Sequence, residues 1–197
     1  SDAGDGDTFA DTLARSSEVE RRDLLRGLGS ALGKMHAGTA SRKEDYDALL
    51  NRQLRHHPEY AEHQALRDDS LQRSILIGAE ILREAGLEPS EQVLERAREA
   101  TKNLSSGRNR AFTPFDLSPD NIIVGETVTF LDYEWAGFRN VGFDVACVVA
   151  GFPQFLFTRP ITDDEAEVFI HAWQRRIVDV WPPVSYTHLR AHETSLH

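Results

Sequence analysis

The sequence predicts a mostly helical α+β protein with a small β-hairpin inserted near its middle. Segments with apolar residues at helical spacing lie on both sides of one β-rich stretch, residues 121–131. In that stretch the runs NIIV and VTFL flank the turn Gly125-Glu126-Thr127, which is typical of a short hairpin. The 197 residues, 40% apolar and 27% charged, have the composition of an ordinary globular protein with one core.

The first helix is expected at residues 17–38. Ser17 stands at its N-cap position, and Gly38 stands where the helix is expected to end. Between these two residues the apolar side chains recur at helical spacing, which predicts one buried face made of Leu24, Leu25, Leu28, Leu32 and Met35.

Three further helices are expected before the hairpin, at residues 42–57, 69–86 and 89–104. The first of them ends near Pro58, which cannot continue a helix. The last begins after Ser90, an expected N-cap. The middle helix carries a set of apolar side chains that we expect to face inward, namely Leu71, Ile75, Ile77, Ile81 and Leu82.

Two helices are expected after the hairpin, at residues 143–152 and 162–181. The first, FDVACVVAGF, is almost wholly apolar and holds the single cysteine, Cys147, for which we predict a packing role. The second begins with Thr162 and Glu165 at the spacing of a capping box, and two consecutive prolines end it.

The two ends of the chain do not follow these patterns. Residues 1–15 lack an initiating Met and open with seven small or acidic residues, so we expect a flexible lead-in on the hinge side of the fold. Residues 184–197 show no apolar periodicity, and SYTHLRAHETSLH resembles translated adapter or vector sequence. We therefore expect a non-native or disordered tail, and a folded body at residues 16–183.

The formal net charge is −10, from 22 basic and 32 acidic residues. This balance argues against a nucleic-acid backbone as a partner and favours a cationic or metal-bridged ligand. No stretch approaches the ~18 apolar residues that a membrane helix needs. A signal-peptide pattern is also absent from the sequence. We therefore expect a cytoplasmic protein with neither nucleic acid nor membrane as a partner.

The hairpin region carries polar residues at a spacing that suits phosphoryl transfer. Asp116 and Asn121 form the pattern Asp-x-x-x-x-Asn, and Asp132 follows the run VTFL. In a phosphoryl-transfer loop of this spacing the Asp accepts the proton of the attacking hydroxyl, and the Asn oxygen binds Mg²⁺. The later Asp is expected to bridge Mg²⁺ to nucleotide phosphates. The pattern alone leaves an alternative open, in which Asp116 begins an Asx turn before Pro119 and Asp132 caps a loop.

Longer motifs around these residues make the chain recognisable. FDLSPDNIIV, VTFLDYEWAGF and GFDVACVV resemble the catalytic segment of the aminoglycoside phosphotransferase and choline kinase-like family, which are small-molecule kinases with a protein-kinase-like fold. DGDTFADTLA is similar to the segment after the family's inter-lobe hinge, and LLRGLGSALGKMHAG to its first large-lobe helix. The resemblance spans about residues 5–183 and implies the C-terminal large lobe of that fold, with a β-hairpin that carries the catalytic and metal-binding loops.

The resemblance implies roles for five side chains. Asp116 takes the position of the catalytic base. Asn121 and Asp132 take the positions that bind Mg²⁺ and, through it, the phosphates of ATP or GTP. Glu134 belongs to the supporting Asp-aromatic-Glu variant of the metal-binding element. Asp144 matches an Asp that opens a large-lobe helix and ties it to the catalytic loop, and we predict that it does so by capping that helix.

The implied activity is transfer of the γ-phosphoryl group of ATP or GTP to a hydroxyl of a small-molecule substrate. An acidic cleft with Asp116, Asp120 and Glu134 would suit a cationic acceptor such as an aminoglycoside or a choline-like amine. Neutral sugars and homoserine-like alcohols stay open as acceptors. Asp120 stands where the family often has Gly, and we expect it to be exposed rather than to bind the metal.

The chain also departs from the family pattern. Pro114-Phe115 stands where the family usually has His-Gly or His-Asn, so rigidity and packing would replace that His. Nothing before Ser17 predicts a small lobe, whose strands cover the nucleotide and whose Lys contacts the phosphates. We therefore expect a large-lobe fragment without its N-terminal small lobe, inactive by itself. The alternatives are a catalytically degenerate, kinase-like module for nucleotide binding or interaction, and a helical interaction domain.

Overall fold

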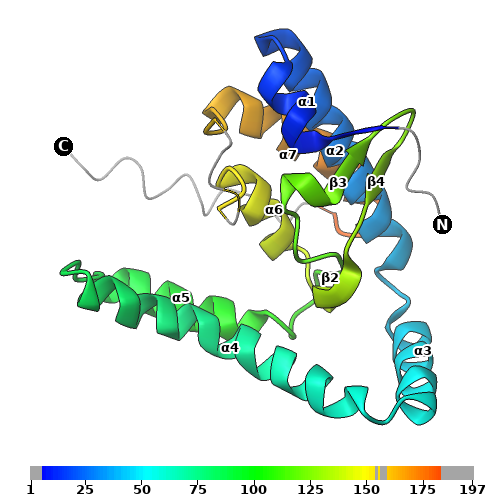
Figure 1. Cartoon of the computed structure of the whole chain (residues 1–197), viewed down its shortest axis with the longest axis vertical. Coiled ribbons are helices and arrows are strands. Elements are labelled where there is room, and N and C mark those ends of the chain that lie inside the picture. Colours follow the sequence, from blue (N-terminus) through cyan, green and yellow to red (C-terminus); the bar gives the residue numbers. More distant parts are fainter. Residues whose placement is uncertain (1–5, 154, 156–158, 183–197) are drawn as a thin grey trace.

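The computed structural model describes residues 6–153, 155 and 159–182. The tail that we predicted at residues 184–197 lies outside these residues. The described part of the chain is mostly helical and holds two small antiparallel sheets, which confirms the α+β class (Figure 1). None of the helices in these described segments is both long and apolar enough to cross a membrane.

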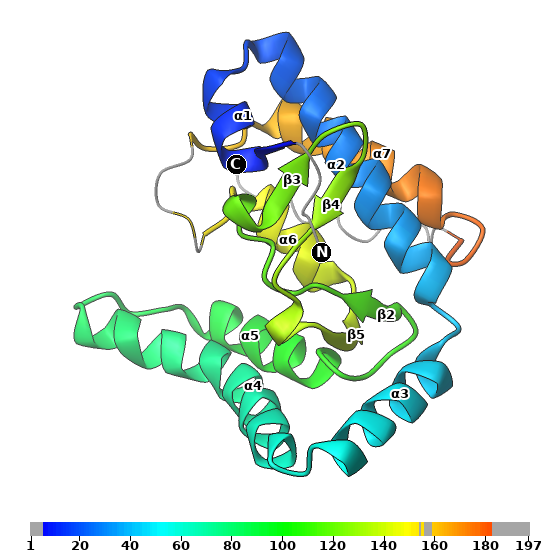
Figure 2. The same cartoon turned by 45° about the vertical axis from the view of Figure 1, so that its right-hand side comes forward.

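Two long helices form the centre of the body, α2 at Glu18–Thr39 and α7 at Asp163–Ile177. They run side by side in both views (Figures 1 and 2). Ser17 is the N-cap of α2, as predicted. The capping box predicted from Thr162 and Glu165 is present at the start of α7. Local sequence signals therefore set where both central helices begin.

The contact between α2 and α7 is close enough to require glycine. A Cβ added to Gly29 would lie 2.4 Å from the carbonyl oxygen of Phe169 on α7. Around this contact the apolar face of α2 joins a core whose large, fully buried members are Phe9, Leu13, Leu25, Leu28, Leu32, Leu117, Ile122, Phe152 and Phe169. This core supports the hairpin and the loops that follow it.

The segment before α2 corrects a prediction, because residues 7–15 are not a flexible lead-in. Asp7–Thr8 forms strand β1, and Phe9–Arg15 forms helix α1. Phe9 and Leu13 lie four residues apart on one face of α1 and are 0% and 2% exposed. Two apolar residues on a single short helix gave too weak a periodic signal to predict it.

Two sheets position the polar loops. Strands β3 at Ile122–Val124 and β4 at Val128–Phe130 pair antiparallel, as the sequence predicts, and β1 extends this sheet in the order β1-β3-β4. The second sheet was not predicted: β2 at Arg110–Thr113 pairs antiparallel with β5 at Gly137–Asn140. The loops with the candidate site residues lie between β2 and β5 in the sequence, so this pairing holds both ends of that segment together.

Three short helical elements complete the region. The 3₁₀ helix η1, Pro119–Asn121, precedes β3, and η2, Tyr133–Trp135, follows β4. Helix α6, Gly142–Val149, comes directly after β5. It contains Cys147, which is partly buried and packs against the core, in keeping with the predicted packing role.

Helices α3 at Lys43–His56, α4 at Tyr60–Glu84 and α5 at Glu91–Asn103 extend away from the body (Figures 1 and 2). Ser90 caps α5 through a hydrogen bond from the N–H of Val93, as predicted for this N-cap. Helix α4 begins at Tyr60 and is therefore longer than the predicted helix.

The apolar face predicted for α4 is only partly buried. Leu71 is 8% exposed, as expected, but Ile77, Ile81 and Leu82 are 46%, 58% and 41% exposed. The side chain of Ile75 lies outside the described ones. Helical spacing shows which side chains share a face, but it does not show whether another element covers that face.

Candidate active site

The candidate base Asp116 lies in the loop between β2 and η1. Phe115 has φ of 68°, in the left-handed region that is costly for a residue with a side chain. The N–H of Asp116 donates to the carbonyl of Pro114 at 2.9 Å, and its carboxylate accepts the N–H of Ser118 at 3.3 Å. The Asx turn considered as an alternative is thus present. It orients the half-buried carboxylate, which is compatible with a role as base.

Asn121 and Asp132 lie at adjacent positions on the two arms of the hairpin. The N–H of Leu131 donates to the carbonyl oxygen of Asn121 at 2.8 Å, so the next residue, Asp132, leaves the hairpin beside Asn121. Asp132 is exposed and has φ of 52°. One amide oxygen and one or two carboxylates are the donors that Mg²⁺ takes from proteins when phosphates and water complete its coordination. These residue types therefore fit the expected cation.

Asp144 corrects the prediction that it caps α6, because Val141 holds the N-cap position. Asp144 lies in the first turn of the helix and is 0% exposed, with its Oδ2 atom 3.1 Å from Nε2 of His36. The indole N–H of Trp173 donates to Nδ1 of the same imidazole at 3.0 Å. A neutral His36 must then carry its proton on Nε2, where it donates to Asp144.

The buried position of Asp144 also affects its ionisation. Burial raises the pKa of Asp144, while the hydrogen bond from His36, the backbone of Phe115 and the charge of Arg139 act in the opposite direction. Because Phe115 directly precedes Asp116, these contacts link α2 and α6 to the loop of the candidate base. The link runs through a buried carboxylate rather than through a helix cap.

Arg139 is a structural residue of the site that the sequence reasoning missed. It lies on β5, is 4% exposed, and its guanidinium carbon is 5.1 Å from the ring centroid of Phe115. One of its N–H groups donates to the carbonyl of Trp135 at 2.6 Å. Arg139 therefore joins Phe115, the residue before the candidate base, to the segment that follows Asp132. A single Arg in a four-residue strand has no spacing signal that would have identified it.

The other two acidic candidates lie on the outside. Asp120 and Glu134 are exposed, as expected for Asp120. The hydroxyl of Ser118 donates to the carboxylate of Asp120, and Arg67 on α4 donates to the backbone carbonyl of Glu134. The contact at Glu134 thus connects α4 to η2 through the main chain.

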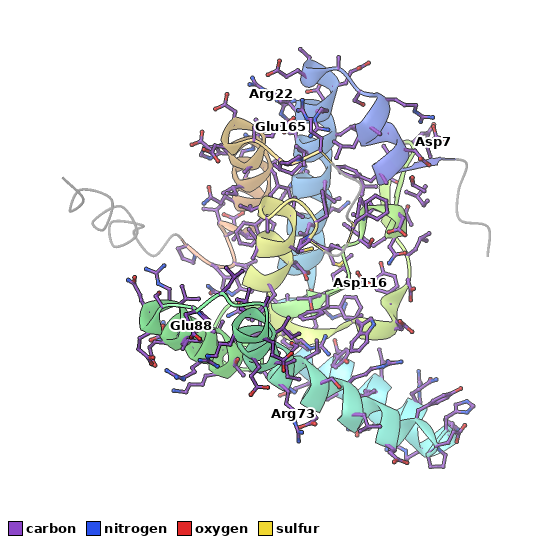
Figure 3. The ribbon with its side chains drawn as sticks, turned by 60° about the vertical axis from the view of Figure 1, so that its left-hand side comes forward. Asp7, Arg22, Arg73, Glu88, Asp116 and Glu165 are labelled. Atoms are coloured by element: carbon purple, nitrogen blue, oxygen red, sulfur yellow. The ribbon has the colours of Figure 1, made fainter. Side chains whose placement is uncertain are left out.

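An open pocket of about 520 Å³ lies against Asp116. In Figure 3, Asp116 is placed between the helical body and the extension formed by α3, α4 and α5. The pocket walls come from both parts, with Leu71 on α4 and Phe143 on α6 among the lining residues. A small molecule in this pocket would therefore lie beside the candidate base.

A comparison with protein families shows which family the chain belongs to. The model of the phosphotransferase enzyme family matches residues 4–186, which is most of the chain. No curated protein matches the chain. The chain therefore belongs to the phosphotransferase enzyme family, and the resemblance to aminoglycoside phosphotransferases and choline kinase-like proteins is confirmed.

Proposed function

We propose that this lobe takes part in Mg²⁺-dependent transfer of the γ-phosphoryl group of ATP or GTP to a hydroxyl of a small molecule. One observation carries the proposal: the hydrogen bond from Leu131 to Asn121 sets Asn121 and Asp132 side by side, five and sixteen residues after Asp116. A base in the loop before the hairpin and two oxygen ligands at the open end of the hairpin are the parts that such a reaction requires of this lobe.

In this proposal each residue has a defined task. The side chains of Asn121 and Asp132 would hold Mg²⁺, which when bound neutralises charge on the phosphates. The carboxylate of Asp116 accepts the proton of the substrate hydroxyl, whose oxygen forms the new bond to the γ-phosphorus. The bond between that phosphorus and the β–γ bridging oxygen breaks, and the nucleoside diphosphate leaves. Asp144 and His36 hold the backbone before Asp116 in place.

The proposal also concerns the lysine that contacts the phosphates in such enzymes. Phosphotransferases of this kind place a lysine from a strand on the phosphates, and none of the strands β1 to β5 in the described residues contains a lysine. We propose that the phosphate-binding lysine comes from a small lobe outside these elements. We also propose that the chain alone binds Mg²⁺–nucleotide weakly and does not catalyse phosphoryl transfer. A catalytically degenerate module is the second candidate, because Phe115, directly before the candidate base, has its backbone in the left-handed region.

Calorimetry of Mg²⁺–ATP with single-residue variants tests the proposal. Asp132→Ala is expected to weaken binding by at least about tenfold, because a direct oxygen ligand is lost. Asp116→Ala is expected to change affinity by no more than about twofold, because a base acts in the chemical step. Asp120→Ala, which removes an equally exposed carboxylate from η1, is the control and should match the parent chain. Equal affinity of the Asp132 variant and the parent would refute the proposed metal site.

A further inference from the structure

The pocket beside Asp116 has walls that are almost entirely apolar. Three aromatic rings line it, those of Phe115, Trp135 and Phe143, together with Leu71 and small residues of α6. The rings of Phe115 and Phe143 lie 6.1 Å apart at an interplanar angle of 31°. Its volume of about 520 Å³ is in the range of pockets that enclose a small organic molecule. A ligand with an apolar body would gain the most from leaving water here.

Few charged side chains line the described part of the pocket. Asp116 carries the one charged side chain among the described residues that line it. The acidic side chains that suggested a cationic acceptor, Asp120 and Glu134, are exposed and do not belong to this lining. Among the described lining residues, a polycationic ligand would therefore find a single carboxylate. That carboxylate is the group expected to accept the hydroxyl proton.

Two of the aromatic walls already carry a cation. The guanidinium of Arg139 lies 5.1 Å from the ring centroid of Phe115, and that of Arg67 lies 5.9 Å from the centroid of Trp135. Neither arginine is among the lining residues of the pocket. Each guanidinium lies over one face of its ring, and its positive charge would repel a second cation bound to the same ring. We therefore expect the pocket to bind a quaternary or primary ammonium group weakly.

Building on the proposed function, we infer that the acceptor of this phosphotransferase is a neutral hydroxyl compound with an apolar, partly flat body. Its hydroxyl lies at Asp116 and its body lies between the aromatic rings and Leu71. The hydroxyl gives its proton to Asp116 and its oxygen takes the γ-phosphoryl group of the nucleoside triphosphate, which leaves as the diphosphate. Aminoglycosides and choline-like amines do not fit this charge arrangement.

A pair of ligands with the same shape and different charge tests the inference. Choline and 3,3-dimethyl-1-butanol differ only in the central atom of the trimethyl group, a charged nitrogen in one and a carbon in the other. We expect the neutral alcohol to bind the purified chain at least about tenfold more tightly, as measured by ligand-observed NMR titration. An aromatic alcohol, 3-phenyl-1-propanol, should bind more tightly still, because it buries more apolar surface.

Two variants locate the binding. Ala146 is exposed on α6 and lines the pocket, so Ala146→Leu should narrow the pocket without disturbing the core and weaken binding of 3-phenyl-1-propanol at least about fivefold. Ala61, exposed in the first turn of α4 and outside the pocket lining, gives the matched control Ala61→Leu, which should bind as the parent does.

The outcomes separate this inference from the proposed function. Choline binding as tightly as its neutral isostere, or no binding of either alcohol, would overturn the inference, even if the same preparation binds Mg²⁺–ATP. Alcohol binding that Ala146→Leu leaves unchanged would overturn it too. If the alcohols bind as expected but Mg²⁺–ATP does not bind, the proposed function is wrong. The conclusion that the pocket binds neutral hydroxyl compounds is then still supported.

Discussion

Replacing Arg21 by Met should strongly destabilise the chain, because Arg21 is the buried partner of Glu165. Nε of Arg21 lies 2.7 Å from one carboxylate oxygen of Glu165 and Nη2 lies 3.3 Å from the other, and the two side chains are 4% and 1% exposed. The pair joins α2 to α7, the two central helices. Met has a similar volume but no charge, so the variant would leave a carboxylate buried without its main partner.

The size of the effect follows from the ionisation of Glu165. Burial alone would raise its pKa, but hydrogen bonds from Arg21 and from the N–H of Thr162, with the charges of Arg21 and Arg159, lower it from 4.5 to about 2. That shift corresponds to about 3 kcal/mol of stability at neutral pH. Arg159 remains in the variant but is largely exposed. We therefore expect a loss of about 3 kcal/mol, as is usual when one partner of a buried pair is removed.

Urea unfolding at several pH values measures this loss. Since the folded-state pKa of Glu165 is depressed, its stabilisation is complete above about pH 4.5 and disappears as the pH falls toward 2. The difference between Arg21→Met and the parent should shrink over the same window. Arg22→Met is the control: its side chain is 39% exposed and pairs with the exposed Asp164, so it should cost less than about 1 kcal/mol. A difference below 1 kcal/mol at pH 7 for Arg21→Met, or one that does not change with pH, would refute the reasoning.

Three further predictions concern the helix contact and the buried network. Gly29→Ala should lower the free energy of unfolding by about 1–3 kcal/mol, because its Cβ would meet a carbonyl of α7 at 2.4 Å. Gly27→Ala, which meets nothing within 4 Å, should raise it by about 0.5–1 kcal/mol, and urea unfolding measures both. Asp144→Asn should become more stable relative to the parent as the pH rises above 3.8, because the raised pKa of Asp144 favours its neutral form. An equal difference in unfolding free energy between variant and parent at about pH 4 and pH 7 would count against this. Trp173→Phe should remove the hydrogen bond to Nδ1 of His36, so the ¹⁵N signal of Nδ1 should shift while the proton stays on Nε2, where Asp144 accepts it; an unchanged Nδ1 signal would contradict this.

Local signals in the sequence predicted much of the fold. Ser17, Ser90 and the pair Thr162 and Glu165 cap helices where expected, because a cap depends on the chemistry of a few adjacent residues. The hairpin of β3 and β4 was predicted for the same reason, since its turn and both strands lie within eleven residues, 121–131. The spacing of the polar residues around that hairpin also belongs to one continuous stretch.

Features that depend on distant contacts could not be predicted. The strands β2 and β5 are four residues each and pair across the whole site segment, so neither has a pattern of its own. His36 contacts Asp144 and Trp173 across 108 and 137 residues of sequence. The exposure of Ile77 shows the opposite error, because an apolar face predicts burial only where another element covers it.

The most direct test of the account maps where Mg²⁺–nucleotide binds. Mn²⁺–ATP, added to the ¹⁵N-labelled chain in place of Mg²⁺–ATP, broadens the amide signals that lie close to the cation. We predict that the signals of Asn121, Leu131 and Asp132 broaden first, that those of α5 keep their width, and that Asp132→Asn abolishes the effect. Broadening centred on another acidic surface, or unchanged in the Asp132 variant, would contradict the assignment of the hairpin as the metal–nucleotide site.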